Sequence, residues 1–311
     1  MATRPLVLDC DTGIDDALAI LWLASRPDLR LVGVGTVHGN IDAGTAALNS
    51  LRVLEVAALE APVVTGARRP LSQPLHLATA VHGEDGMGNS GQRPPSSAPS
   101  AGSAAEQLVR LAREHAGELV VLTTGPLTNL ALAILLEPEL PRLVSQVVVM
   151  GGAVTCPGNI TPLAEANVWH DPEAAALALS SGLPLTLVGL DVTARVRLGA
   201  EELDALASGG ERARFASTLL PHYLDFYEQV LGERVCLLHD PLAAVLTVEP
   251  SLASYERMVV GVDLGASMAR GATVADRREG VPVPSDDPRV TVAVEVDAPS
   301  ALATFMEGML S

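Results

Sequence analysis

Lysine is missing from this sequence, in which all 20 basic residues are arginines and 37 residues are acidic. The formal net charge of −17 repels the phosphates of nucleic acids and the head groups of anionic membranes. We therefore expect no nucleic-acid partner and no membrane partner. The absence of lysine also excludes an enzyme that holds a phosphate group with that side chain.

Cysteine is scarce, with Cys10, Cys156 and Cys236 far apart and in no CxxC pair. This spacing predicts neither a disulfide framework nor a thiolate zinc site, and it suits a reducing compartment. The sequence shows no secretory signal pattern and no apolar run long enough to span a membrane. We therefore expect a cytoplasmic protein. With 48% hydrophobic residues, a chain of 311 residues can bury a substantial core.

The most informative feature is a cluster of acids after the first apolar run. Residues 9–16 read Asp-Cys-Asp-Thr-Gly-Ile-Asp-Asp. Four carboxylates at one strand end repel each other unless a cation lies among them, and hard cations such as Ca²⁺ and Mg²⁺ take oxygen ligands. The structural alternative is that Asp15 or Asp16 caps the next helix and Asp9 faces solvent. That alternative does not readily explain Asp11.

Strand and helix patterns alternate along the chain. The expected strands cover residues 6–8, 29–37, 62–65, 118–124, 144–150, 183–190, 258–262 and 290–296. The expected helices cover residues 15–25, 43–59, 172–179, 213–232 and the end of the chain from residue 299, and another opens at Pro126. This alternation predicts an α/β fold with a mainly parallel central sheet covered by helices. We expect a single domain over residues 1–311, with the active site at the carboxyl ends of the strands.

Two segments interrupt this pattern. Residues 66–103 are rich in Pro, Gly and Ser and contain His82, which predicts a mobile functional loop. Residues 213–232 carry Tyr223, Phe226 and Tyr227, although aromatic residues make up only 3% of the chain. These three side chains form either a wall on which a base stacks or a helix face that packs inward. The residues alone leave both interpretations open.

Four segments carry most of the polar groups at the expected strand ends. They are residues 9–16, Gly-Pro-Leu-Thr-Asn at 125–129, residues 151–175 with Gly-Gly-Ala at their start, and His-Asp-Pro-Leu-Ala at 239–243. In this order they resemble the inosine-uridine preferring nucleoside hydrolases, and the resemblance spans almost the whole chain. It implies an enzyme that hydrolyses the N-glycosidic bond of ribonucleosides to free base and ribose.

The resemblance also implies one Ca²⁺ per chain at the sheet edge, held by oxygen ligands. The matching ligands are Asp11, Asp16, Asp240 and the backbone carbonyl of Thr124. The positions that match ribose-binding groups are Asp15, Asn40 and Asn167 for the 2′- and 3′-hydroxyls, Asn159 and Glu165 for the 5′-hydroxyl, and Met150 for the lining of the sugar site.

The same residues suggest roles in catalysis. A carboxylate-rich pocket stabilises the positive charge of an oxocarbenium-like transition state. Asp11, beside the expected metal, can take a proton from water. His239 is the candidate general acid for the leaving base, because an imidazole titrates near neutral pH, and His82 is the second candidate. Tyr227 is a candidate contact to the base.

The presence of both His82 and His239 is similar to family members that act on pyrimidine nucleosides, some of which also accept inosine. We therefore expect uridine and cytidine as substrates, with inosine as a further candidate, in nucleoside salvage or catabolism. We also expect a homodimer or a homotetramer. Base preference depends on the loops and on Tyr223 and Tyr227, so the resemblance does not fix it.

Two other functions fit parts of the sequence. An aspartate-based phosphatase also begins with a strand that ends in Asp-x-Asp, but it needs a phosphate-binding lysine. A Ca²⁺-dependent nucleoside- or ribose-binding protein would use the same hydroxyl ligands without turnover. Single residues have structural alternatives as well: Asn40 closing a turn, Asn159 and Asn167 satisfying loop backbone, Glu165 in solvent and His239 in the core.

Overall fold

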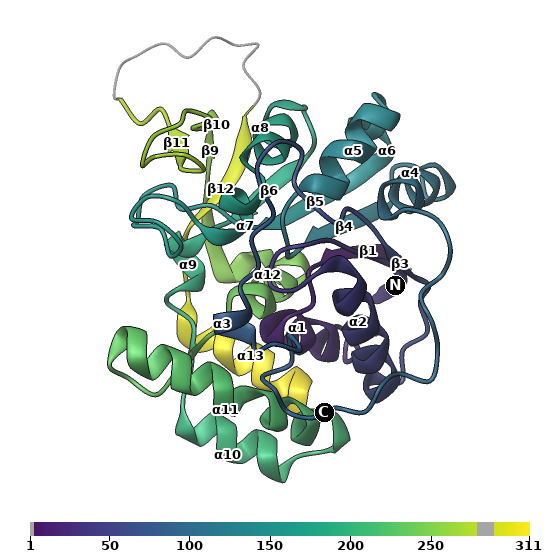
Figure 1. The fold of residues 1–311 in the computed structure, drawn as a ribbon, viewed down its shortest axis with the longest axis vertical. Helices are drawn as coiled ribbons and strands as arrows, with labels where there is room; N and C mark the ends of the chain where they lie inside the picture. The colour runs from purple at the N-terminus through teal and green to yellow at the C-terminus, as the bar shows by residue number, and fades with distance from the viewer. Residues whose placement is uncertain (1–2, 279–288) are drawn as a thin grey trace.

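The computed structural model describes residues 3–278 and 289–311 and is built around an eight-stranded sheet (Figure 1). In spatial order the strands are β3 (Val63–Thr65), β2 (Leu29–Thr36), β1 (Arg4–Cys10), β4 (Leu119–Thr123), β5 (Val144–Met150), β6 (Leu185–Val188), β12 (Val290–Val296) and β9 (Ala253–Met258). Neighbouring strands are parallel except β12 and β9, which are antiparallel. The expected α/β fold with a mainly parallel sheet is confirmed.

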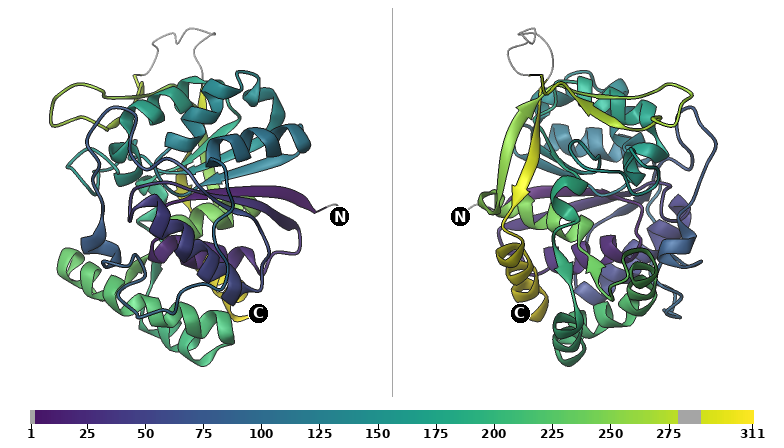
Figure 2. Two further views of the ribbon diagram at one scale, coloured as in Figure 1. Left: turned by 45° about the vertical axis from the view of Figure 1, so that its right-hand side comes forward. Right: turned by 90° about the vertical axis from the view of Figure 1, so that its left-hand side faces the viewer.

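Side chains along the central strands alternate between two hydrophobic cores, one on each face of the sheet. In β1, Leu6 and Leu8 belong to one core and Val7 to the other. The helices of the first core are α1 (Ile14–Leu23), α2 (Ala43–Ala57), α9 (Leu190–Thr193), α10 (Ala200–Ser208), α11 (Glu211–Leu231), α12 (His239–Val248) and α13 (Ala298–Leu310). Those of the second core are α4 (Ala104–Glu114), α5 (Thr128–Leu136), α6 (Leu140–Leu143), α7 (Ala166–His170) and α8 (Pro172–Ser180) (Figure 2).

Two expected strands differ from the structure near the carboxyl half of the chain. Residues 258–262 are not one strand: β9 ends at Met258, and β10 (Val260–Val262) pairs with β11 (Thr273–Ala275) in a separate two-stranded sheet. The strand expected over residues 183–190 is shorter, because α9 begins at Leu190. Both errors arose because continuous apolar runs do not show where a strand ends. The remaining elements are β7 (Arg197–Leu198), paired with β8 (Cys236–Leu237), and the 3-10 turn η1 (Pro250–Leu252).

The segment 66–103 crosses the carboxyl edge of the sheet and contains the short helix α3 (Thr79–His82). Its first part is tied down by buried side chains: Asn129 Oδ1 accepts from the backbone N–H of Ala67 at 2.8 Å, and Asp171 Oδ2 accepts from that of Leu71 at 3.0 Å. The mobility expected for this segment stays a prediction. Among the described residues, no helix combines the length and apolar character needed to cross a membrane.

The last helix provides a test of the packing. Gly308 of α13 lies against α1, and a Cβ at this position would be 2.5 Å from Nε1 of the buried Trp22 and 2.7 Å from Oγ of Ser25. Gly308→Ala should therefore lower the free energy of unfolding by about 1–3 kcal/mol, despite the better helix propensity of alanine. Urea unfolding measures this, with Glu307→Ala at an exposed position as the control. A more stable Gly308→Ala variant would contradict the described packing.

Candidate active site

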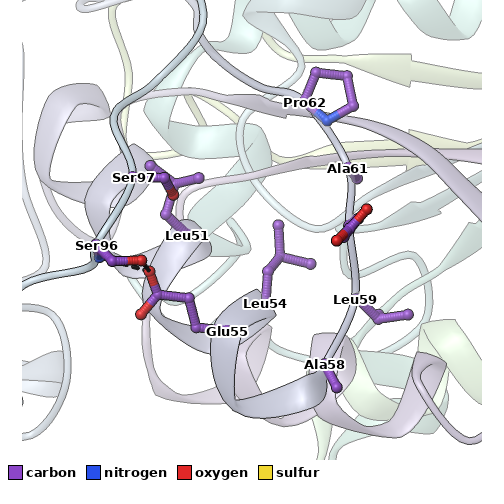
Figure 3. A pocket seen from close by; sticks show the side chains of 10 residues that line it. Leu51, Leu54, Glu55, Ala58, Leu59, Ala61, Pro62, Ser96 and Ser97 are labelled. Atoms are coloured by element: carbon purple, nitrogen blue, oxygen red, sulfur yellow. Dashed lines mark hydrogen bonds between the residues drawn. The ribbon is translucent and has the colours of Figure 1, made fainter.

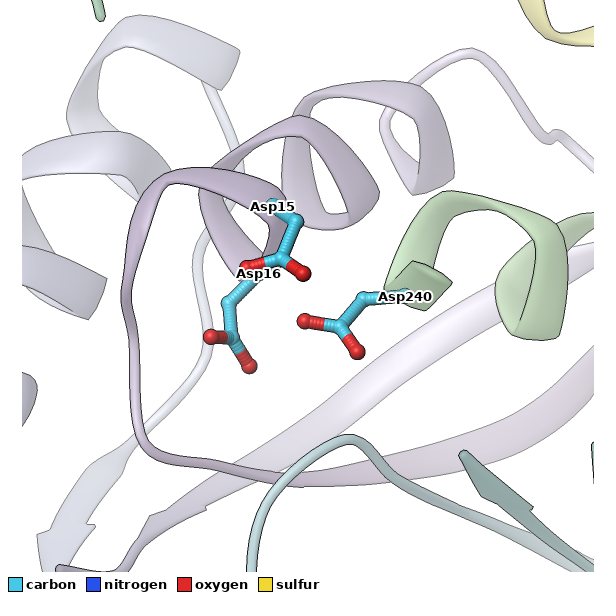
Figure 4. Close-up of side chains that lie close together, drawn as sticks. All are labelled: Asp15, Asp16 and Asp240. Carbon is cyan, nitrogen blue, oxygen red and sulfur yellow. The ribbon is translucent and has the colours of Figure 1, made fainter. Parts of the chain in front are cut away.

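Three buried carboxylates meet at the carboxyl edge of the sheet (Figure 4). Asp15 and Asp16 lie in the first turn of α1, and Asp240 lies in the first turn of α12. One carboxylate oxygen from each lies within 4.8 Å of those of the other two. The sequence reasoning grouped Asp11, Asp16 and Asp240 as ligands and gave Asp15 to the sugar. The structure places Asp15 itself in the tight group.

Asp11 adjoins this group through a shared amide. Asn40 Nδ2 donates to Asp11 Oδ1 and to Asp16 Oδ2, both at 3.2 Å, and the backbone N–H of Asn40 donates to Asp11 Oδ2 at 2.6 Å. Thr124 Oγ1 donates to the other oxygen of Asp16 at 2.6 Å. Asn40 therefore holds the carboxylates of Asp11 and Asp16 next to each other, so it does more than close a turn.

Asp9 does not join the acidic group, contrary to the expectation of four carboxylates around one cation. Its Oδ1 accepts from Asn129 Nδ2 at 2.7 Å, and the residue lies beside Gly35 and Ala104. It is also buried rather than solvent-exposed, so the structural alternative was wrong on this point. Burial raises the pKa of Asp9 to about 7.

Glycine at position 13 permits the close packing of the site. A Cβ there would lie 2.5 Å from His82 Nδ1 and 2.8 Å from Asn40 Nδ2. The backbone N–H of Gly13 donates to Asp16 Oδ2 at 2.8 Å, and the N–H of the next residue, Ile14, donates to His82 Nδ1 at 3.2 Å. The start of α1 thus fixes an acid and an imidazole together.

The charges in this group are incompletely balanced. Burial raises the pKa of Asp15 and Asp16 to about 6, and the Asp15 carboxylate adds to the shift of Asp16. Burial and the neighbouring carboxylates raise the pKa of Asp11 and Asp240 well above the usual range. Asp15 Oδ1 is buried without a hydrogen-bond partner. A hard cation with oxygen ligands fits these residues.

The predicted sugar-binding residues line one cavity of about 430 Å³ together with Asp15 and Asp240. Asn167 Nδ2 donates to the carbonyls of Thr124 and Met150, at 2.9 and 3.1 Å. The Thr124 carbonyl, a predicted metal ligand, therefore already accepts one bond and has one lone pair left. The members of the predicted set that line this cavity are Asp15, Asn40, His82, Thr124, Met150, Asn159, Glu165, Asn167, Tyr227, His239 and Asp240.

Glu165 is buried, so the solvent-exposed alternative was wrong. Its Oε1 accepts from the N–H of Asn167 at 2.8 Å, and its Oε2 accepts from the N–H of Gly152 and of Val168, at 2.9 and 3.1 Å. It caps α7 and braces the turn after β5. Asn159 Oδ1 accepts from the N–H of the next helix's first residue, Ala166, at 2.9 Å. Both residues brace the loop while lining the cavity.

Aromatic and imidazole side chains line the same cavity and reach its carboxylates, since the Tyr223 hydroxyl lies 3.3 Å from Asp15 Oδ2 and His82 Nδ1 lies 3.9 Å from Asp15 Oδ1. Tyr223 and Tyr227 of α11 are buried and also line it, so this helix face packs inward and contributes to the site. Tyr227 hydroxyl and His239 Nε2 are 2.9 Å apart. Burial lowers the pKa of His82 and His239 to about 4. The expectation of an imidazole that titrates near neutral pH is therefore wrong for both rings in this environment.

Two further features were missed by the sequence reasoning. Thr193 Oγ1 lies 2.8 Å from His239 Nδ1, and Asp191 accepts from the N–H groups of Val154 and Thr155 at 2.9 and 2.6 Å. The structure places Asp191 in α9, where it braces the loop after β5. The sequence does carry a signal for them, because Asp191 and Thr193 lie just beyond the end of the buried strand β6, where parallel sheets bind ligands.

A second, more open hollow of about 650 Å³ lies between α2 and residues 96–97 (Figure 3). Leu51, Leu54 and Leu59 form much of its wall, and Glu55 Oε1 accepts from Ser96 Oγ at 2.5 Å beside it. None of the acids or histidines described above lines it. The smaller cavity, which brings carboxylates, imidazoles and tyrosine hydroxyls together, is therefore the candidate active site.

Comparisons with known proteins show the family to which this chain belongs. The inosine-uridine preferring nucleoside hydrolase family matches residues 6–303. The probable uridine nucleosidase 2 of Arabidopsis thaliana is 37% identical over 99% of this chain and 98% of its own. Among solved structures, the plant nucleoside hydrolase PpNRh1 has a TM-score of 0.95 at 31% identity and full coverage of both chains. The purine-preferring ribonucleoside hydrolase from Gardnerella vaginalis has a TM-score of 0.92 at 30% identity, covering 98% of each. This chain belongs to the inosine-uridine preferring nucleoside hydrolase family and is a ribonucleoside hydrolase.

Proposed function

We propose that this enzyme is a Ca²⁺-dependent hydrolase of pyrimidine ribonucleosides, uridine and cytidine, with inosine as a further substrate. The observation that carries the proposal is the lining of the cavity, which combines a group of carboxylates with tyrosine hydroxyls and imidazoles. Its volume of about 430 Å³ lies within the usual range for small-molecule sites. Ribose suits the carboxylates by its hydroxyls, and a base suits the tyrosine and histidine side chains, here called the base end, by its ring.

The base preference rests on the relatives. Uridine nucleosidase activity, named for the Arabidopsis relative, supports the pyrimidine assignment, and the purine-preferring relative from Gardnerella vaginalis supports inosine. Release of ribose from uridine, cytidine, inosine and adenosine tests it directly. Binding of uridine without steady ribose release would instead indicate a binding protein. A role in nucleoside salvage or catabolism, a cytoplasmic location and a homodimer or homotetramer accompany the proposal.

We assign the Ca²⁺ to Asp11, Asp16, Asp240 and the carbonyl of Thr124, with Asp15 close enough to share its charge. This hard-oxygen set contains three carboxylates, Asp15 adds a fourth beside it, and one oxygen of Asp15 lacks a hydrogen-bond partner. When bound, such an ion orients water and the ribose hydroxyls and lowers the pKa of its water.

Asp11 is the proposed general base. It takes a proton from the attacking water, whose oxygen bonds to C1′ while the C1′–N bond breaks and its electron pair leaves with the base. The two Asn40 hydrogen bonds hold the Asp11 carboxylate in one orientation. Positive charge that develops on the sugar lies beside the remaining carboxylates, which stabilise it.

His239 acts on the departing base, with Tyr227 beside it and His82 on the segment 66–103. The base gains negative charge as the bond breaks, so hydrogen-bond donors at this end of the cavity lower the barrier. His82 lies at the end of α3 against Gly13, and its Nδ1 is 3.9 Å from Asp15 Oδ1, so it adjoins the acidic group. Its role depends on how the segment 66–103 closes over substrate.

The metal assignment predicts that Asp240→Asn changes the stability of the protein in opposite directions with and without Ca²⁺. In chelator, Asp240→Asn should be more stable than the wild type, because it removes one of the buried like charges. With free Ca²⁺ at roughly 100 times its Kd, the wild type should gain about 2.7 kcal/mol and the variant little. Thermal unfolding and elemental analysis measure this, with exposed Asp204→Asn as the control. Zn²⁺ in place of Ca²⁺ in active protein would refute the assignment.

The general base is tested by a matched pair of aspartates. Asp11→Asn should lower kcat on uridine by about 10²- to 10⁴-fold, the usual range for loss of a general base. Asp9→Asn should stay close to wild type, because Asp9 bonds to Asn129 outside the acidic group. Metal content measured on the same samples separates lost catalysis from lost metal. Near-full kcat for Asp11→Asn contradicts the proposed role.

Substrates with different leaving groups distinguish the roles of His239 and His82. His239→Ala should lower kcat strongly on uridine or inosine, and much less on p-nitrophenyl riboside, whose leaving group departs without a proton. His82→Ala should change KM as well as kcat, mainly for natural nucleosides. Steady-state kinetics on both substrate classes provide the comparison. Equal losses on both classes for His239→Ala would assign that residue to the sugar, the metal or the fold.

A further inference from the structure

Five buried side chains from four helices form one continuous hydrogen-bonded chain behind the base end of the cavity. The Tyr223 hydroxyl lies 3.3 Å from Asp15 Oδ2 and 3.3 Å from the Tyr227 hydroxyl. Tyr227 lies 2.9 Å from His239 Nε2, and His239 Nδ1 lies 2.8 Å from Thr193 Oγ1. The chain therefore runs from the acidic group to a threonine on α9.

The direction of each bond follows from the carboxylate end. The Tyr223 hydroxyl donates its single proton to Asp15 Oδ2. Tyr223 must then accept from Tyr227, which uses the proton of Tyr227. At the next link Tyr227 can only accept, so His239 carries its proton on Nε2. A neutral ring with Nε2–H leaves Nδ1 as an acceptor.

The hydrogen bond of the Thr193 hydroxyl independently indicates the same tautomer of His239. Thr193 is fully buried, and among the described residues His239 Nδ1 is the one hydrogen-bond partner of its hydroxyl. If Nδ1 carried the proton, the hydroxyl proton of Thr193 would be buried without an acceptor, which is costly. If Thr193 donates to Nδ1, every proton in the chain has an acceptor. Both ends therefore require the same tautomer.

We propose that Thr193 is a positioning residue that holds neutral His239 in the Nε2–H tautomer. This inference rests on the proposed role of His239 at the leaving base. Thr193 is not among the residues that line the cavity, whereas His239, Tyr223 and Tyr227 are. Thr193 therefore acts through the imidazole and does not touch substrate.

The tautomer decides whether Tyr227 has a proton to offer the base. With Nε2–H, Tyr227 accepts from His239, and its own proton points along a long 3.3 Å link to Tyr223. A bound base can accept the hydrogen bond from the Tyr227 hydroxyl in place of Tyr223. With Nδ1–H, Tyr227 must instead donate to Nε2 and has no proton left. Aligned donors also polarise one another, so the Thr193 and His239 links strengthen the donor at Tyr227.

The test replaces one hydroxyl with a methyl group of similar size. Thr193→Val should lower kcat on uridine by roughly 10- to 100-fold, the range for residues that orient a functional group from behind. It should leave hydrolysis of p-nitrophenyl riboside close to wild type, and Thr193→Ser should restore the activity on uridine. Thr247→Val is the matched control, since Thr247 is a buried helical threonine whose hydroxyl donates only to the carbonyl of Ala243. Equal losses of Thr193→Val on both substrates overturn the proposal.

A second measurement does not depend on activity or on the stability of a variant. Nitrogen NMR of wild-type protein with ¹⁵N-labelled histidine, near pH 7, should show a protonated Nε2 and an unprotonated Nδ1 for His239. His239→Asn identifies the signals, and Thr193→Val should shift the Nδ1 signal. A wild-type His239 protonated at Nδ1 overturns the inference. If the wild type releases no ribose from nucleosides, the proposed function fails while this measurement still decides the tautomer.

Discussion

The burial of several carboxylates at one edge of the sheet is the constraint on which the rest of the site depends. Asp15, Asp16 and Asp240 come from the first turns of two helices that pack against each other, α1 and α12. Mutual repulsion in a buried position raises the free energy of the metal-free fold. The large hydrophobic core around those helices offsets this cost, and a bound cation would remove much of it.

The same helices also join the acidic group to the side chains of the base end. Asp240 and His239 are adjacent in sequence, so the acidic group and the base end share the start of α12. Tyr223 connects them a second time, because its hydroxyl bonds to Asp15 while its helix carries Tyr227. The acidic group and the side chains of α11 are therefore mechanically linked, and a shift of α11 would disturb both.

Much of the fold and site followed from local signals in the sequence. Apolar strands ending in polar residues predicted the parallel sheet and an active site at the carboxyl ends of its strands, whereas Asn40 and Asn167 were assigned from the family resemblance. The bracing roles of Asn129 and Asp171 toward the segment 66–103 depend on contacts between distant residues. A pattern read along one chain does not reveal such contacts.

The lowered pKa of His239 and its contact with Thr193 were unpredictable for a related reason. Burial, not residue type, moves the pKa of an imidazole away from neutrality, and burial depends on how α9, α11 and α12 pack. Asp9 shows the converse. The local pattern grouped it with its neighbours, but its side chain points to the other face of the strand and bonds to Asn129.

The position of Asp240 has a consequence for how the molecule is made. Its partners Asp15 and Asp16 lie near the start of the chain, so the acidic group cannot assemble until most of the polypeptide has left the ribosome. The early α1 residues must wait without their cation while the intervening strands and helices are synthesised. Capture of the ion would then be a late event in folding, and loading with metal would mark chains whose amino-terminal and carboxyl-terminal parts have come together.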